Sequence, residues 1–379
     1  MKRTKRQSYI TSYDKGIFLT YLALSLAGLL VMLDICSVYS SLAYFYKQLV
    51  FFITSIFIVL FILYYFDLQR LKPLVPALMY LTLGVLVFVL LRGTTVKGAT
   101  RQLSLGFISF QPSFMARIAL VFLFAKVIDE KLDELRESKL VLFIDRFRFL
   151  IAMTLITFVL IILQRHLSTL IIGGLSLMGM LFYAGLRKRI VIFICVIGIL
   201  AGVVILKAGA EYRSSRIDIY KKYSLFIRDP EVKLDAHQDY QVRESLTALS
   251  SGGLMGTGPS RGRAKHFYLP EARTDYVYTI IGEEFGFMGG LLIFGLHCLL
   301  FFRAFKVANA QENNYLKYLC AGLAMNIFFN ALVNTGVAMS ILPSTGNTLP
   351  FISYSGSALL TDSASIGVIL NISAKRKYV

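Results

Sequence analysis

The chain contains about ten long apolar segments, each of which could cross a membrane as a helix. A helix needs roughly 20 apolar residues to span about 30 Å of hydrocarbon, and it pairs its own backbone polar groups there. The segments are expected near residues 17–38, 48–66, 73–92, 107–128, 148–164, 167–186, 189–209, 276–302, 316–342 and 350–373. Hydrophobic residues make up 56% of the chain and charged residues 16%, which excludes an ordinary soluble protein. The sequence predicts an all-α integral membrane protein.

The positions of lysine and arginine predict the orientation of these helices. Arg70 and Lys72, and the stretches 126–148, 187–189 and 303–317, make alternate connections basic, as cytoplasmic loops are. With about ten helices, both termini are cytoplasmic. This distribution accounts for the net charge of +18, which therefore does not indicate nucleic-acid binding. No cleavable signal peptide is visible, so the first helix is expected to remain as an anchor.

The predicted organisation has five parts. They are a basic tail at 1–16, seven helices at 17–209, a large extracytoplasmic loop at 210–275, three helices at 276–373 and a second basic tail at 374–379. The loop is too long for a simple connection, so we expect it to be functional or to contain helices. Residues 212–223 are typical of a helix on the membrane surface. Val242, Leu246 and Leu249 share one face of a second helix, which Gly252 and Gly253 can end.

The predicted outer face combines one well-placed carboxylate with several cations. Asp275 stands where the polar loop becomes the eighth hydrophobic segment. An ionisable residue inside a membrane segment, such as Arg117, is a functional candidate, although snorkelling to the headgroups would also explain it. Residues 256–265 form a glycine-rich basic loop that suits a lipid-linked phosphate better than a nucleotide. The candidate phosphate-binding cations are Arg101, Arg117, Arg213, Arg216, Lys265 and Arg273.

Helical geometry separates the acidic residues near Asp275. If the eighth helix begins at or just before Asp275, Gly282 and Gly286 lie on the face of Asp275, and Gly290 continues a surface that lets another helix approach closely. Glu284 then points to the opposite side and Glu283 lies about a quarter turn away. We therefore expect Asp275 to be the base candidate, Glu271 to orient the loop and Glu284 to support the helix from behind.

These residues match the needs of sugar transfer from a lipid diphosphate. A general base accepts the proton of the attacking hydroxyl, and fixed cations stabilise the departing pyrophosphate. An anion transporter could use the same groups. The cysteines, Cys36, Cys195, Cys298 and Cys320, lie in predicted helices without CxxC spacing, so a zinc site or disulfide framework is not expected. A Mg²⁺ or Mn²⁺ ion bridging Asp275 and pyrophosphate remains open.

Short motifs occur in a fixed order along nearly the whole chain. They are Gly98–Arg101 with Phe110–Ser113, Tyr240–Gln241 with Ser245, Ser251–Gly253 with Gly256 and Gly258, Leu269–Glu271 with Thr274–Asp275, Gly282–Gly286, Asn334, and Pro343–Gly346 with Leu349–Tyr354. In these motifs the sequence resembles the SEDS family (shape, elongation, division and sporulation), the membrane peptidoglycan glycosyltransferases typified by FtsW and RodA.

The resemblance implies ten helices, with the large loop between helices seven and eight. It also implies polymerisation of lipid II into β-1,4 glycan at the outer face of the bacterial cytoplasmic membrane, with release of a polyprenyl diphosphate. It assigns the family's essential loop aspartate to Asp275. A class B penicillin-binding transpeptidase and other divisome or elongasome membrane proteins are the implied partners, with division and elongation both open. The supporting residues are Gln111, Ser113, Gln241, Glu271, Glu283, Ser353 and Ser357.

The sequence departs from the family pattern at several positions. Phe114 replaces a glutamate after Gln-Pro-Ser, and Arg117 replaces a lysine, so an acid that could pair with the cation has become aromatic. Arg117 therefore needs another partner. Gln102 stands where tryptophan is common, Ser355 replaces a glycine, and residues 164–169 read Gln-Arg-His-Leu-Ser-Thr rather than Gln-Pro-Asp-Leu-Gly-Thr.

Two other functions stay open on the sequence. A membrane protein with polar residues near the outer leaflet could move lipid II across the bilayer, although the inner halves of the predicted helices carry few charges. A scaffold whose glycine faces bind a single-pass protein is a further alternative, and it is compatible with enzymatic activity.

Overall fold

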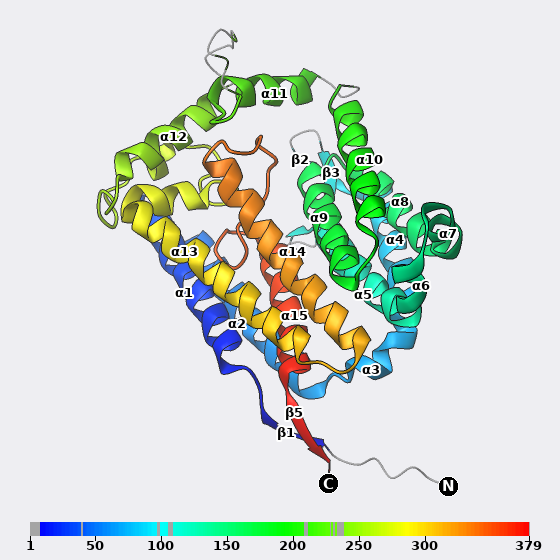
Figure 1. Ribbon diagram of the computed structural model, residues 1–379. Helices are drawn as coiled ribbons and strands as arrows, with labels where there is room; N and C mark the ends of the chain where they lie inside the picture. The colour runs from blue at the N-terminus through cyan, green and yellow to red at the C-terminus, as the bar shows by residue number, and fades with distance from the viewer. Residues whose placement is uncertain are drawn as a thin grey trace.

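The fold is given by a computed structural model that describes residues 8–38, 41–96, 99–104, 109–207, 211–227, 229, 232 and 239–378. Within these ranges, the side chains of residues 8–9, 95–96, 99–101, 104, 203–207, 211–215, 267–268 and 376–378 are not described. The chain is predominantly helical, with long helices gathered into a bundle (Figure 1). This confirms the predicted helical class.

Every predicted membrane segment overlaps a helix. These helices are α1 (Lys15–Val38), α2 (Ala43–Tyr65), α4 (Val75–Arg92), α5 (Pro112–Glu130), α8 (Arg148–Leu163), α9 (Leu167–Ala184), α10 (Lys188–Lys207), α13 (Val277–Asn309), α14 (Asn314–Ala338) and α15 (Gly356–Ser373). By length and composition, 6 of the described helices could cross a membrane, or up to 7 if α7 (Leu140–Arg146) and α8, bent by 78°, form one span. The chain is a multi-pass membrane protein, and ten crossings stay a prediction.

The two ends of the described chain are paired with each other. Strand β1 (Ser8–Ser12) lies antiparallel to β5 (Lys375–Tyr378), and the paired strands lie at one end of the bundle (Figure 1). Just beyond the strands, the Asp14 amide donates to Ser373 Oγ at 3.1 Å. Because paired strands lie on one side of a membrane, this pairing predicts an even number of crossings.

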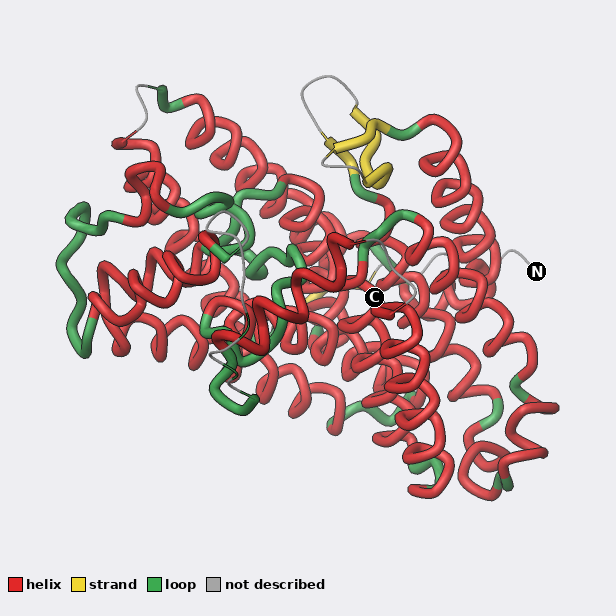
Figure 2. Tube along the Cα trace, turned by 90° about the horizontal axis from the view of Figure 1, so that it is seen from above, coloured by secondary structure: helices red, strands yellow, loops and turns green. Residues whose placement is uncertain are grey.

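The opposite end of the bundle carries the elements of the large loop. Helices α11 (Glu211–Tyr223) and α12 (Tyr240–Gly252) lie there, followed by a π-helical turn at Ala264–Tyr268 (Figure 1). Gly253, with φ of 53°, follows α12, so two helices form where the loop sequence predicts them. A small sheet of β2 (Thr94–Val96), β3 (Ala99–Ser104) and β4 (Ser109–Phe110) stands at the rim (Figure 2).

Several helix starts differ from expectation. Helix α2 begins at Ala43 rather than near residue 48, and α15 begins at Gly356 rather than near residue 350. Helix α5 begins at Pro112 rather than near residue 107, because β4 occupies the preceding residues and proline suits the first helical position. Helix α13 begins at Val277, two residues after Asp275, because the amides of residues 274–276 all bond to the Glu271 carbonyl in a turn. The short helices α3 (Leu68–Leu71), η1 (Lys72–Leu74) and α6 (Leu132–Glu137) lie in connections.

Helix α13 is interrupted at Gly286, which has φ of 66° and ψ of −165°. The loop after α12 runs beside this break: the amides of Thr257 and Gly258 donate to the carbonyls of residues 283 and 284 at 2.9 and 3.0 Å. The glycine face predicted on α13 is therefore confirmed at Gly282. The Gly282 carbonyl passes so close to Gly252 of α12 that a Cβ on Gly252 would lie 2.0 Å from its oxygen. The prediction is wrong at Gly286, which admits the loop backbone instead of another helix.

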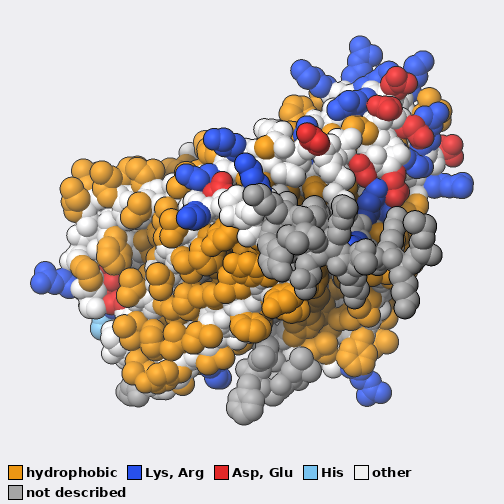
Figure 3. Space-filling model, turned by 90° about the horizontal axis from the view of Figure 1, so that it is seen from below, with side chains coloured by type: hydrophobic (Ala, Val, Ile, Leu, Met, Phe, Trp, Pro, Cys, Tyr) orange, Lys and Arg blue, Asp and Glu red, His pale blue; other side chains and the backbone are white. Residues whose placement is uncertain are grey.

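The outside of the bundle is apolar and its centre is tightly packed. Among the candidate membrane-spanning helices, α14 is the most enclosed. In its apolar stretch 72% of the residues are buried, and the helix packs against α5, α9, α13 and α15. Large side chains such as Phe57 and Leu30 are exposed on other helices, as expected for lipid-facing positions. From below, hydrophobic side chains cover a broad area; the largest group of charged side chains lies at one corner, and others are scattered nearer the middle and the edges (Figure 3).

Candidate functional site

Asp275 lies in a turn that is fixed from two directions. The amides of Thr274, Asp275 and Tyr276 donate to the Glu271 carbonyl at 3.1, 3.1 and 3.2 Å, and Glu271 has a left-handed φ of 57°. Asn334 Nδ2 of α14 donates to the Asp275 carbonyl at 2.9 Å. The turn therefore holds the half-buried Asp275 just before the N-terminus of α13, beside the C-terminal part of α14.

The loop between α14 and α15 approaches the Asp275 carboxylate. A Cβ built on Gly346, whose φ is 71°, would lie 3.5 Å from Asp275 Oδ2, so the loop backbone passes close to the acid. Asn334 Nδ2 also donates to the Asn347 carbonyl at 2.5 Å, and Asn347 Nδ2 donates to the Asn330 carbonyl at 3.1 Å. Two side-chain amides thus hold the irregular backbone of the loop between α14 and α15.

The end of this loop is attached to the Asp275 turn. Ser353 Oγ donates to the Thr274 carbonyl at 2.5 Å and accepts from the Leu349 amide at 2.8 Å. The Tyr354 amide donates to the Arg273 carbonyl at 2.9 Å. Ser353 therefore helps to position the Asp275 turn by binding its backbone.

Two predicted cations lie around the same turn and loop. The Arg216 guanidinium of α11 donates to the Ser344 carbonyl at 2.6 Å, and the Arg273 guanidinium lies 4.0 Å from the centre of the Tyr44 ring. Gln241 Nε2 of α12 donates to the Pro270 carbonyl at 3.1 Å, just before the turn. The large loop is thus tied to the Asp275 region through α11 and α12.

A buried histidine organises the starts of α5 and α9. His166 Nδ1 lies 3.0 Å from Gln111 Nε2, 2.8 Å from Ser113 Oγ and 2.8 Å from Thr169 Oγ1. The adjacent Ser168 Oγ donates to the Gly346 carbonyl at 3.4 Å, which joins this cluster to the loop beside Asp275. His166 was not among the candidate site residues, although it occupies a motif position where the SEDS pattern has an aspartate.

Arg117 finds its partner on another helix. Its Nη2 atom lies 3.7 Å from Asp362 Oδ1 of α15, and both side chains are buried. Asp362 was not among the sequence candidates. A carboxylate inside an otherwise apolar segment was the signal that could have found it.

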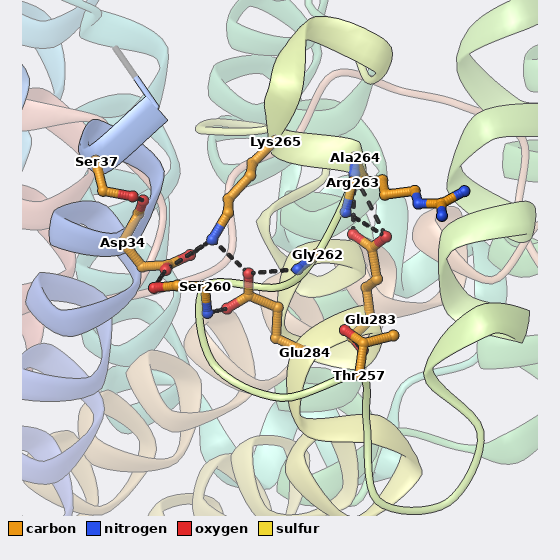
Figure 4. A network of polar contacts seen from close by, with 10 residues as sticks. All are labelled: Asp34, Ser37, Thr257, Ser260, Gly262, Arg263, Ala264, Lys265, Glu283 and Glu284. Atoms are coloured by element: carbon orange, nitrogen blue, oxygen red, sulfur yellow. Dashed lines mark hydrogen bonds and ion pairs between the residues drawn. The ribbon is translucent and has the colours of Figure 1, made fainter. Parts of the chain in front are cut away.

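Lys265 lies in a separate network (Figure 4). Its ammonium donates to both oxygens of Asp34 on α1 at 2.7 Å and to Glu284 Oε1 at 2.6 Å, and it is buried. Two carboxylates surround one ammonium, so a pyrophosphate at Lys265 would have to displace an acid. This placement differs from the expectation that Lys265 is available to an anion.

Glu283 and Glu284 hold the glycine-rich loop through its backbone (Figure 4). Glu284 accepts from the amides of Ser260 and Gly262, each at 3.2 Å, and Glu283 accepts from those of Arg263 and Ala264 at 2.8 and 3.0 Å. The loop is thus folded onto protein carboxylates. A groove of about 810 Å³ beside it is lined by residues that include Arg261, Arg263 and His266.

The remaining candidates contribute less to the geometry. The side chains of Arg101 and Arg213 lie outside the described part of the chain. Ser357 is buried in the first turn of α15, where its carbonyl accepts from Thr361 Oγ1. Among the described residues, no group of three or more His, Cys, Asp or Glu side chains is arranged to hold a metal ion.

Comparison with known proteins gives a consistent result over the full length. Residues 15–378 match the FtsW/RodA/SpoVE model, described as cell cycle protein. A relative from Trichlorobacter lovleyi, named probable peptidoglycan glycosyltransferase FtsW, is 32% identical over 382 residues, which cover 97% of this chain and 95% of the relative.

Solved structures show the same fold. One similar chain comes from a peptidoglycan synthase complex described as coordinating polymerization and crosslinking, with a TM-score of 0.78, 23% identity and coverage of 96% of this chain and 98% of that one. The rod shape determining protein RodA of Thermus thermophilus has a TM-score of 0.68 and 23% identity, covering 96% of this chain and 97% of RodA.

Proposed function

The chain belongs to the FtsW/RodA/SpoVE family of cell cycle proteins, and from this premise we propose that it polymerises lipid II into β-1,4 glycan strands. The reaction takes place at the outer face of the bacterial cytoplasmic membrane. Relatives named peptidoglycan glycosyltransferase that cover nearly the whole chain support this activity. The observation that carries the proposal is the placement of Asp275: Asn334 of α14 donates to its backbone carbonyl, and its carboxylate lies beside the backbone of Gly346.

In this reaction Asp275 acts as the general base. A sugar hydroxyl of one lipid-linked substrate loses its proton to the Asp275 carboxylate while its oxygen attacks the anomeric carbon of a second. The new glycosidic bond forms as the bond to the polyprenyl diphosphate breaks, and the electron pair leaves with the diphosphate. Arg216 and Arg273 lie around the same turn and loop, where their positive charge stabilises the leaving group.

The test is Asp275→Asn in the purified full-length protein with lipid II as substrate. This change keeps the size of the side chain and removes the base, so we expect the polymerisation rate to fall by about 10²–10⁴-fold while thermal stability is retained. Asp218→Asn is a matched control, because Asp218 pairs only with neighbouring Lys221 on α11 among the described residues. Glycan strands of normal length and rate from the Asp275→Asn protein would refute the assignment.

A divalent cation, if used, would be held by substrate and protein together. We infer this because the described residues offer no cluster of ligands, whereas Asp275 and a pyrophosphate can share one Mg²⁺ or Mn²⁺. Chelation would then slow polymerisation without changing the thermal stability of the substrate-free protein, and adding back the ion would restore the rate.

The inferred partner is a class B penicillin-binding transpeptidase, with other membrane proteins of the divisome or elongasome. Similarity to a chain from a peptidoglycan synthase complex supports this inference, since that complex joins polymerization to crosslinking. Assaying lipid II polymerisation with and without the transpeptidase tests whether the partner is required.

Transport of lipid II across the membrane is the second candidate, and buried polar side chains favour it. Asn326 and Asn330 of α14 are buried, and within the described part of the chain both amide atoms of each side chain lack a hydrogen-bond partner. Labelled lipid II in proteoliposomes separates the two functions. A transporter would exchange the lipid between leaflets without forming polymer, and Asp275→Asn would leave that exchange intact.

A further inference from the structure

The Arg117–Asp362 pair is buried and incompletely satisfied. Only 1% of the Arg117 side chain and 4% of the Asp362 side chain are exposed. The 3.7 Å between Nη2 and Oδ1 exceeds hydrogen-bond length, so the contact is an ion pair without a direct hydrogen bond. Within the described part of the chain, Arg117 Nε and Nη1 and Asp362 Oδ2 have no hydrogen-bond partner. Buried ion pairs are normally completed by further hydrogen bonds.

The other neighbours of Arg117 cannot neutralise it. Phe114, one helical turn before it, lies with its ring centre 5.7 Å from the guanidinium carbon. Gly173 of α9 lies beside the aliphatic stem, since a Cβ there would be 3.7 Å from Arg117 Cγ. Position 114 is where the SEDS pattern carries a glutamate. In this chain the counter-charge therefore comes from α15 rather than from the helix of the arginine.

Arg117 is connected to the site at Asp275. The Phe114 ring that faces Arg117 also lies 5.6 Å from the His166 ring. His166 contacts Ser113, and its neighbour Ser168 contacts the Gly346 carbonyl beside Asp275. A continuous set of packed residues thus runs from the cation to the candidate base.

We propose that Asp362 is a positioning residue that holds the Arg117 guanidinium so that its unpaired N–H groups bind a phosphoryl oxygen of the lipid diphosphate. A guanidinium carries five N–H donors and stays protonated, and Asp362 neutralises it from one side only. A phosphoryl oxygen supplies the acceptor that Nε and Nη1 lack. The substrate class rests on the proposed function, whereas the role of Asp362 rests on the geometry of this pair.

The test measures binding of undecaprenyl diphosphate to the purified full-length protein in detergent, together with thermal unfolding. Asp362→Asn removes the counter-charge that positions Arg117. The displaced guanidinium would lose its charge-assisted hydrogen bond to the phosphoryl oxygen, so we expect affinity to fall about tenfold or more. Adding Phe114→Glu to Asp362→Asn places a carboxylate one turn from Arg117, and affinity should return to within about threefold of the wild type. Asp129→Asn is the control, because it breaks the pair with Lys72 at the other end of α5 and should leave affinity unchanged.

Two outcomes would overturn the proposal. One is an Asp362→Asn protein that binds the diphosphate as tightly as the wild type. The other is a double variant that regains thermal stability but not affinity, which would make Asp362 a purely structural residue. If Asp362→Asn alone does not fold, the double variant decides. Polymerisation by the wild type is scored separately: a protein that binds the diphosphate through this pair yet makes no glycan refutes the proposed function alone.

Discussion

At the scale of single residues, the site is positioned mainly by side chains that bind backbone carbonyls. Asn334, Ser353 and Arg216 each donate to a carbonyl of the Asp275 turn or of the loop between α14 and α15. A buried carbonyl left without its donor costs about 1–3 kcal/mol, so each of these bonds fixes the backbone more firmly than a surface contact would. Asn334 holds Asp275 through its backbone carbonyl.

Asp239 ties the start of α12 to the end of α11, and its titration gives a pH prediction. Burial acts to raise its pKa, but hydrogen bonds from Lys222 and Tyr223 and the charges of Lys222 and Arg243 hold the pKa below its usual value. A carboxyl with a lowered folded-state pKa stabilises the protein above its unfolded-state pKa, and that stability is lost as pH falls through the folded-state value.

We therefore expect Asp239→Asn to lower the free energy of unfolding by about 1–3 kcal/mol at pH 7, because the hydrogen bonds to a charged acceptor are lost. Thermal unfolding across pH should show this difference shrinking once wild-type Asp239 is protonated. Burial, followed by the bond to Asp239, raises the pKa of Tyr223 to about 12, so that tyrosine stays neutral throughout. An equal difference at pH 7 and at a pH low enough to protonate wild-type Asp239 would contradict the assignment.

At the scale of elements, the break in α13 joins the large loop to the membrane helices. Gly286 has a backbone conformation that side chains rarely adopt, and a Cβ there would lie 2.4 Å from the Gly256 amide nitrogen. The amides of Phe287 and Met288 bond to the carbonyls of Gly253 and Leu254 across the break. The glycine is required by the approach of two backbones.

Gly286→Ala should therefore destabilise the protein by about 1–3 kcal/mol through backbone strain, with added cost from the clash. Gly295→Ala is the matched control in the same helix, because no atom other than its chain neighbours and the nearby backbone of its own helix lies within 4 Å of the added Cβ. There the change should stabilise by roughly 0.5–1 kcal/mol, as alanine does in a helix interior. Thermal unfolding of both variants checks the pair, and equal effects would rule out a special role for the break.

At the scale of the whole molecule, pairing of β1 with β5 constrains the topology. Hydrogen-bonded strands near the two termini predict an even number of crossings, and the basic connections predict that both ends lie in the cytoplasm. Single cysteines at Ser12 and Lys375, in a background without the native cysteines, should both react with a permeable thiol reagent and resist an impermeant one in intact cells. Labelling of one position only by the impermeant reagent would disprove the pairing across the termini.

The sequence by itself determined the helical membrane class, the helices of the large loop and the candidacy of Asp275. These depend on local information: the length of an apolar run, the spacing of a face, or a motif read within a few residues. Only the tertiary structure decided the partners. Arg117 meets Asp362, Lys265 meets Asp34, and Gly286 meets the loop at Gly256. Such pairs join residues far apart in the chain, so they follow from how whole helices pack and from the need to neutralise every buried charge, which no local pattern records.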